Sequence, residues 1–251
     1  MLKKQNSGRI SGLSDFYDFI KMGITHLSIL VLGLIQGIKH AIDADHVAAV
    51  ITIVSGEKSV RKSTLVGIFW GIGHTLALLI VGTILLLLRT AIPKHLSLYF
   101  EFAVGVMLII LGINVIVKIH KKKIHLHPHN HSNVEHIHFH SHFASVSHEH
   151  SHRAIKKSLF VGILHGMAGS GGITLLILAG ITNYWHGLIY LLVFGVGTIL
   201  GMALLSSIIS LPFTIIPAKL NNAKRKLEFS AGAMSIILGI TLMYSILFYG
   251  G

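Results

Sequence analysis

The chain has 251 residues, 52% of them hydrophobic and only 12% charged, with a mean hydropathy of +0.73. An ordinary soluble domain has about twice this share of charged residues and would expose large apolar patches at this composition, so we expect an integral membrane protein. The net charge of +12 would indicate a nucleic-acid partner for a soluble protein. Here the Lys and Arg residues lie between apolar runs, as they do in cytoplasmic loops, and we expect no nucleic-acid partner.

Six apolar segments predict an all-α polytopic membrane protein with six transmembrane helices. The first segment is 30 residues long and polar in its middle, whereas one span needs about 20 residues, so we expect it to be kinked or partly unwound. Pro212 and Pro217 are predicted to end the fifth segment, and 219–226 to form a basic loop. The segments run over 25–54, 63–88, 98–118, 158–182, 184–211 and 227–249.

The two halves of the chain resemble each other. Because a unit of three spans is odd, the second unit is expected to be inverted relative to the first, an arrangement typical of transporters with a site near the midplane. Chance similarity among Gly- and Ile-rich helices is the alternative, and the nearly constant offsets of 125, 124 and 127 residues disfavour it. The matches pair GIKH at 37–40 with GILH at 162–165, WGIG at 70–73 with FGVG at 194–197, and EFxxGxMxIILGI at 101–113 with the same pattern at 228–240.

We therefore divide the chain into three parts. Residues 1–119 are an N-terminal arm, with a short interfacial helix at 15–22 and no cleavable signal peptide, and the first three-helix repeat. Residues 120–156 are a His-rich loop, expected to be disordered because it is polar and of low complexity, and 157–251 are the second repeat. Basic residues on the loop's side outnumber those on the other side about two to one, which predicts a cytoplasmic loop and both termini outside.

The stretch His40–His46, HAIDADH, places four potential metal ligands inside the first apolar segment. Each charge left unpaired at bilayer depth costs roughly 2.5–3.5 kcal/mol, so such groups must be paired, ligated or in contact with water. In an ideal helix His40, Asp43 and His46 share one face and Asp45 points elsewhere, towards Lys39 or a neighbouring helix; in an unwound segment all four could converge. A polar network that only fixes helix packing is the alternative to a metal-selecting site of a divalent-metal permease.

Further histidines extend this metal hypothesis. His74, in an otherwise apolar segment, is either a ligand or a hydrogen-bonded structural residue. His165 is the repeat partner of His40 and precedes a Gly-rich stretch, where it is either a ligand, with Ser170 and Thr174 nearby, or part of a packing seam. Residues 120–152 hold twelve of the 19 histidines, which predicts metal capture or buffering, because neutral imidazole binds nickel, cobalt, zinc and copper; a spacer is the alternative. The loop ligands are assigned to His125, His127, His129, His131, His136, His138, His140, His142, His148, His150 and His152.

The stretch GIKHAIDADHVAAV, with its His40-x4-Asp45-His46 pattern, resembles the signature of the nickel/cobalt transporter family (NiCoT). FWGIGHT at 69–75 is similar to that family's next motif, and the two cover about 40 residues. The resemblance implies that His40, Asp45 and His46 select the metal, with Asp43 and His74 in support.

The second half departs from the eight-span members of that family. Around His165 the chain has Gly, Ala and Ser where those members carry an Asp and a Glu. It is more similar to the shorter branch of the superfamily, which includes urease-accessory-type permeases and nickel/cobalt efflux proteins with His-rich loops. This departure leaves the direction of transport open.

These observations predict a non-enzymatic secondary transporter of Ni²⁺ or Co²⁺, multi-pass in the plasma membrane. Because no nucleotide-binding motif is present, the membrane potential or a proton gradient is the expected energy source. We expect no tightly bound cofactor; the expected partners are the metal ion and the lipid bilayer, and the candidate protein partners are a second copy of the chain or a metallochaperone. A membrane-anchored metal-binding accessory protein is one alternative, and an intramembrane zinc hydrolase, which the lack of an HExxH motif disfavours, is the other.

Overall fold

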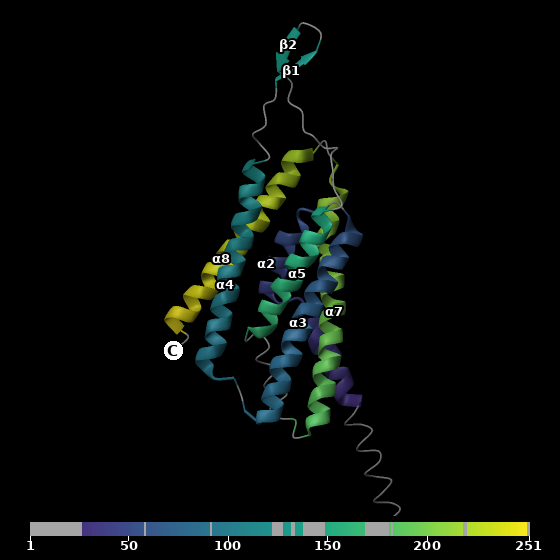
Figure 1. Cartoon of the computed structure of the whole chain (residues 1–251), viewed down its shortest axis with the longest axis vertical. Coiled ribbons are helices and arrows are strands. Elements are labelled where there is room, and N and C mark those ends of the chain that lie inside the picture. The colour runs from purple at the N-terminus through teal and green to yellow at the C-terminus, as the bar shows by residue number, and fades with distance from the viewer. Residues whose placement is uncertain are drawn as a thin grey trace, which may run out of the picture.

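The computed structural model describes residues 27–57, 59–90, 92–121, 128–131, 134–137, 149–168, 181, 183–217 and 220–249. The body formed by these residues is helical (Figure 1). Four of its helices are long and apolar enough to cross a membrane, which confirms the predicted class of all-α polytopic membrane protein. The helices are Leu27–His40, α2 (Ala44–Val54), α3 (Val60–Leu88), α4 (Lys94–Lys121), α5 (Glu149–Met167), α7 (Tyr184–Ile215) and α8 (Asn221–Tyr249), and the four candidate spans are α3, α4, α7 and α8.

The first apolar segment is broken, as its polar centre predicted. The helix Leu27–His40 and α2 meet at a bend of 56°, and together they form a fifth candidate span. Asp43 is extended, with φ −60° and ψ 148°, and caps the N-terminus of α2. Its carbonyl accepts the first hydrogen bond of α2, from Val47 N–H at 3.0 Å. Asp is common at this position, but here its side chain makes no capping hydrogen bond and contacts His40 instead.

Two expectations for the end of the fifth segment are wrong. Pro212 lies inside α7, which continues to Ile215 and ends before Pro217. A proline removes one backbone donor but keeps its carbonyl, and the Pro212 carbonyl accepts from the Ile216 N–H at 3.3 Å at the end of α7. The expected basic loop at 219–226 is mostly helical as well, because α8 begins at Asn221. Lys224 Nζ donates to the carbonyl of Phe213 at 3.0 Å and so joins the two helix ends.

The stretch between α4 and α5 contains a backbone hairpin. Strand β1 (Pro128–His131) pairs with β2 (Val134–Ile137) in antiparallel register, with His129 opposite His136, and Figure 1 shows the hairpin beyond the end of the helical body. Helices reach into both ends of this stretch, since α4 extends to Lys121 and α5 begins at Glu149. The rest of it, the interfacial helix expected at 15–22 and residues 169–180 of the expected fourth segment lie outside the described residues.

Helices α4 and α8 form an antiparallel pair along one side of the body (Figure 1). Their backbones approach closely at two levels, Gly105 against Gly239 and Gly112 against Gly232. Since residue numbers rise along one helix as they fall along the other, the two helices run in opposite directions. Glycine allows such backbone contact because it carries no side chain.

The Leu27–His40 helix and α5 pack on α7 and α3, which are also antiparallel, and α2 lies against both this group and the pair of α4 and α8. Gly71 of α3 lies against Ile199, and Thr75 lies against Gly195 of α7. The Leu27–His40 helix follows α7, with Gly37 against the backbone of Phe194. Helix α5 follows α3 in the same manner, with Gly162 against the backbone of Trp70. His40 and His165 each lie one turn beyond these glycines, which carries both imidazoles into the centre.

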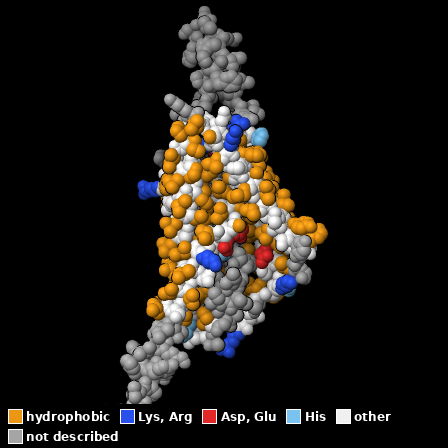
Figure 2. Space-filling model, turned by 180° about the vertical axis from the view of Figure 1, so that it is seen from behind, with side chains coloured by type: hydrophobic (Ala, Val, Ile, Leu, Met, Phe, Trp, Pro, Cys, Tyr) orange, Lys and Arg blue, Asp and Glu red, His pale blue; other side chains and the backbone are white. Residues whose placement is uncertain are grey.

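The outer face of this body is apolar. Figure 2 shows mainly hydrophobic side chains along the visible face, with a few acidic groups at mid-height. Ile80 on α3, Leu204 on α7 and Ile237 on α8 are each 60–62% exposed. An apolar surface of this extent would associate in water, whereas lipid tails cover it without cost, so the outer face is suited to a bilayer.

The close approach of α4 and α8 predicts different tolerances at two glycines. A Cβ at Gly112 would meet the Gly232 carbonyl, which is backbone, whereas a Cβ at Gly105 would first meet the flexible Met243 side chain at 2.7 Å. Gly112→Ala should therefore destabilise the protein by about 1–3 kcal/mol, as overpacking does, and Gly105→Ala by clearly less. Thermal unfolding in detergent measures both variants. Equal melting temperatures for Gly112→Ala and the wild type would disprove the close approach.

Candidate metal site

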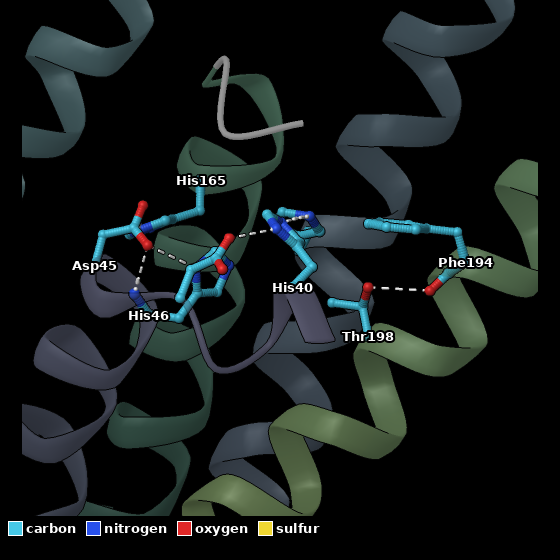
Figure 3. A network of polar contacts seen from close by, with 8 residues as sticks. His40, Asp45, His46, His165, Phe194 and Thr198 are labelled. Atoms are coloured by element: carbon cyan, nitrogen blue, oxygen red, sulfur yellow. Dashed lines mark hydrogen bonds and ion pairs between the residues drawn. The ribbon is translucent and has the colours of Figure 1, made fainter. Parts of the chain in front are cut away.

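Four imidazoles lie together in the interior. His40 ends the first helix, His46 lies in the first turn of α2, His74 on α3 and His165 on α5. Their exposed fractions are 7%, 0%, 1% and 0%, in that order. The ring centroids are 4.7 Å apart for His40 and His46, 4.7 Å for His46 and His165, and 4.9 Å for His40 and His74. Figure 3 shows His46 between His40 and the pair of His165 and Asp45.

Asp43 determines which nitrogen of His40 faces the interior. Its Oδ2 lies 2.8 Å from His40 Nδ1, and because the carboxylate accepts, Nδ1–H donates. In neutral His40 the Nε2 lone pair then points inward, where it lies 3.2 Å from His74 Nε2. A carboxylate behind a histidine is the usual arrangement for orienting a metal-binding imidazole. Asp43 is half-exposed and thus supports His40 from the edge of the cluster.

Asp45 does the same for His46. Its Oδ1 accepts from the His46 backbone N–H at 2.9 Å and from His46 Nδ1 at 3.0 Å. The other oxygen, Oδ2, lies 3.5 Å from His165 Nε2, which is longer than an ordinary hydrogen bond. His46 Nε2 and both ring nitrogens of His165 are buried without a hydrogen-bond partner among the described residues. Such unsatisfied nitrogens are rare in protein interiors, and these nitrogens are available to bind a metal ion.

The break in the first segment brings these groups together. Of the two alternatives, the shared helical face of His40, Asp43 and His46 does not apply, because the backbone is not helical at 41–43. The alternative of an unwound segment is correct: Asp45 turns towards His46 and His165. Lys39, the other candidate partner of Asp45, is exposed.

The described residues form two overlapping groups that could hold a metal ion. One consists of His40, His46 and His74, and the other of Asp45, His46 and His165; within each group the ligand atoms lie within 4.8 Å of one another. Ligand atoms around a tetrahedral ion are about 3.3 Å apart when metal–nitrogen bonds are 2.0–2.1 Å, so small side-chain movements would close either group. Imidazole and carboxylate together suit nickel, cobalt and zinc.

Two buried aromatic side chains adjoin the cluster and were not assigned from the sequence. The Trp70 ring lies 5.3 Å from His165 and 6.0 Å from His46, and the Phe194 ring lies 5.5 Å from His40. Thr198 donates to the Phe194 carbonyl at 3.0 Å (Figure 3). The sequence signal was present, because the two aromatics open the matching stretches WGIG and FGVG.

The side chains of the other predicted site residues are not described by the structure. Ser170 and Thr174 lie outside the described residues. The loop histidines lie either outside them or where only the backbone is described. Their assignment to metal capture therefore stays a prediction.

Comparison with known proteins gives two matches. Residues 26–248 match a family model, NicO, described as "High-affinity nickel-transport protein". The chain is 40% identical over 220 residues to the "Urease accessory protein UreH" of Bacillus sp. (strain TB-90), covering 88% of this chain and 92% of that protein. No solved structure matches the chain.

The two groups predict a graded loss of metal binding. Because His46 belongs to both groups, His46→Ala should weaken Co²⁺ binding by about 100-fold or more. Loss of a residue that only hydrogen-bonds a metal ligand costs about 10–100-fold in affinity, so the loss of a ligand itself should be at least as large. His74→Ala and His165→Ala should each weaken it less, since one group survives in each. Equilibrium dialysis measures these affinities, in the full chain and in a variant lacking 122–148, because the loop histidines are also predicted to bind metal.

His95→Ala is the matched control for that series. His95 is exposed in the first turn of α4 and should not affect the affinity. Wild-type affinity in His46→Ala would show that the cluster is not the binding site.

Proposed function

The chain belongs to the family of high-affinity nickel-transport proteins, and we propose that it carries Ni²⁺ through the cluster at His40, Asp45, His46, His74 and His165. As a multi-pass membrane transporter of nickel or cobalt ions, it is not an enzyme. The observation that carries this site is the set of buried imidazole nitrogens that have no hydrogen-bond partner among the described residues, inside an apolar helical body. We name nickel rather than cobalt as the proposed substrate because the family description names nickel.

The ligands can replace the water that the ion loses. Neutral imidazoles supply nitrogen donors, and Asp45 supplies a negative charge that offsets part of the charge of the ion. The two ligand groups share His46, so an ion can exchange its other ligands while it stays bound to this residue. Transport requires binding that is strong enough for an ion to be taken up but divided over several positions so that it can leave.

Two inverted three-helix repeats form the framework of the proposed transporter. The contacts of the described helices support this, because they recur in pairs: Gly37 meets the carbonyl of Phe194, and Gly162 meets that of Trp70. The sequence repeat exchanges Gly37 with Gly162 and Phe194 with Trp70, so each contact is the counterpart of the other. The same exchange turns the contact of Gly105 with Gly239 into that of Gly232 with Gly112.

Six spans in the plasma membrane, with a cytoplasmic His-rich loop, complete the proposal. The broken first segment and the four long helices account for five spans, and α5 with the residues that follow it would be the sixth. The basic residues near the loop favour the cytoplasmic side. The loop histidines would capture metal there, and the membrane potential or a proton gradient would drive transport.

Radiolabelled flux tests the function. Cells that produce the wild type should move ⁶³Ni²⁺ across the membrane in a saturable way, whereas His46→Ala should lower the flux at least tenfold because both ligand groups lose a member. A variant without 122–148 should still transport. If only the loop deletion abolished metal handling, a membrane-anchored metal-binding protein would be the better description.

Cysteine labelling tests the orientation, since the chain has no cysteine of its own. Lys226→Cys, in the first turns of α8, should react with a membrane-impermeant maleimide only after the cells are opened. His95→Cys, at the opposite end of the body, should react in intact cells. The reverse pattern would place the loop outside the cell.

A further inference from the structure

The imidazoles of His40, His46 and His165 follow one another in ring contact and form a row. Phe194 lies at the His40 end of this row and Trp70 at the His165 end. Phe194 contacts His40, with ring centroids 5.5 Å apart and planes tilted by 39°. Trp70 contacts His165 at 5.3 Å and 49°. Both aromatics are buried, with exposed fractions of 1% and 0%. Figure 3 shows the Phe194 ring pointing at His40 from the side opposite Asp45 and His165.

The two aromatics also lie at different depths. Thr75 lies level with Gly195 across the antiparallel helices, and Gly71 with Ile199. Phe194 is therefore level with about residue 76 of α3, six residues beyond Trp70, or roughly 9 Å at 1.5 Å per residue. His74 lies between these two levels. Helix α3 begins at the end of the body that bears the hairpin of the His-rich loop (Figure 1). Because Trp70 lies closer to the start of α3 than the level of Phe194 does, Trp70 is nearer that end and Phe194 nearer the other.

No hydrogen bond from a described residue holds either ring in place. The Trp70 indole Nε1 has no hydrogen-bond partner among the described residues, and a phenyl ring has no polar atom to bond. The backbones of both residues, in contrast, are held by Gly37 and Gly162. A ring can therefore turn about its side-chain bonds without breaking a hydrogen bond, while its helix stays in place.

We propose that Trp70 and Phe194 are the two gates of the metal path, Trp70 on the side of the His-rich loop and Phe194 on the opposite side. This inference rests on the proposed transport function and on the inverted repeat, which exchanges the two residues. Each ring blocks the approach of a hydrated ion to the histidine at its end of the row. When one ring turns aside, the cluster opens to one side only, which is what alternating access requires.

Release of bound nickel tests the gates. Membranes loaded with ⁶³Ni²⁺ are freeze–thawed with EDTA, which strips exposed metal, and resealed with EDTA inside and outside. The wild type should release its shielded nickel slowly. Trp70→Ala should release it at least tenfold faster, mainly to the loop side, and Phe194→Ala equally fast, mainly to the other side. Right-side-out and inverted vesicles distinguish the sides, because filtration separates external from enclosed nickel.

Two sets of variants separate gating from structural support. Phe213→Ala removes another buried aromatic of α7, distant in sequence from the site, and should not change the side of release. Trp70→Phe and Phe194→Tyr restore a ring and should restore slow release. A merely structural role would lower the melting temperature without producing opposite sides.

The outcomes distinguish the two proposals. Shielded nickel in the wild type, together with release to the same side or at the wild-type rate in both alanine variants, would overturn the gates and leave the transport function standing. Absence of shielded nickel in the wild type would overturn the proposed site and the gates with it.

Discussion

Ionisable side chains lie at the centre of a body with an apolar outer face, where each polar atom without a partner costs free energy. The two carboxylates reduce this cost in the first segment, because each bonds the Nδ1 atom of one histidine. Asp43 accepts the Nδ1 proton of His40, and Asp45 accepts that of His46 together with its backbone N–H. Asp45 also lies in the first turn of α2, where the helix dipole favours a negative charge. The break in the helix thus stabilises the same charge that the site uses.

The sequence predicted which polar residues gather in the interior better than it predicted their geometry. The density of His and Asp at 40–46 and the repeat partner His165 both depend on residue type and spacing, and the structure brings these side chains together. The choice between a shared helical face and an unwound segment could not be made from spacing, because an angle of 100° per residue holds only in a continuous helix. The extent of α7 past Pro212 was not predicted, because a proline weakens a helix without determining the residue at which the helix ends.

Trp70 and Phe194 show a second limit of prediction from the sequence. Trp70 and Phe194 were visible in the sequence as matching positions of the two halves. Large apolar residues are common in every buried helix face, however, so nothing in their type distinguished them from ordinary packing. Their relation to the histidines depends on the packing of two helix pairs, α5 on α3 and the first helix on α7, which brings each aromatic next to one histidine.

The glycine contacts link each outer histidine to one aromatic. Gly37 ties His40 to Phe194, and Gly162 ties His165 to Trp70. If the first helix and α7 moved against α3 and α5, each histidine would keep its aromatic, but the contact of His40 Nε2 with His74 Nε2 would open, because it joins the two pairs. His46 lies beyond the backbone break and belongs to neither pair. In the proposed transport it stays bound to the ion while the other ligands change, since it is the residue that the two candidate groups share.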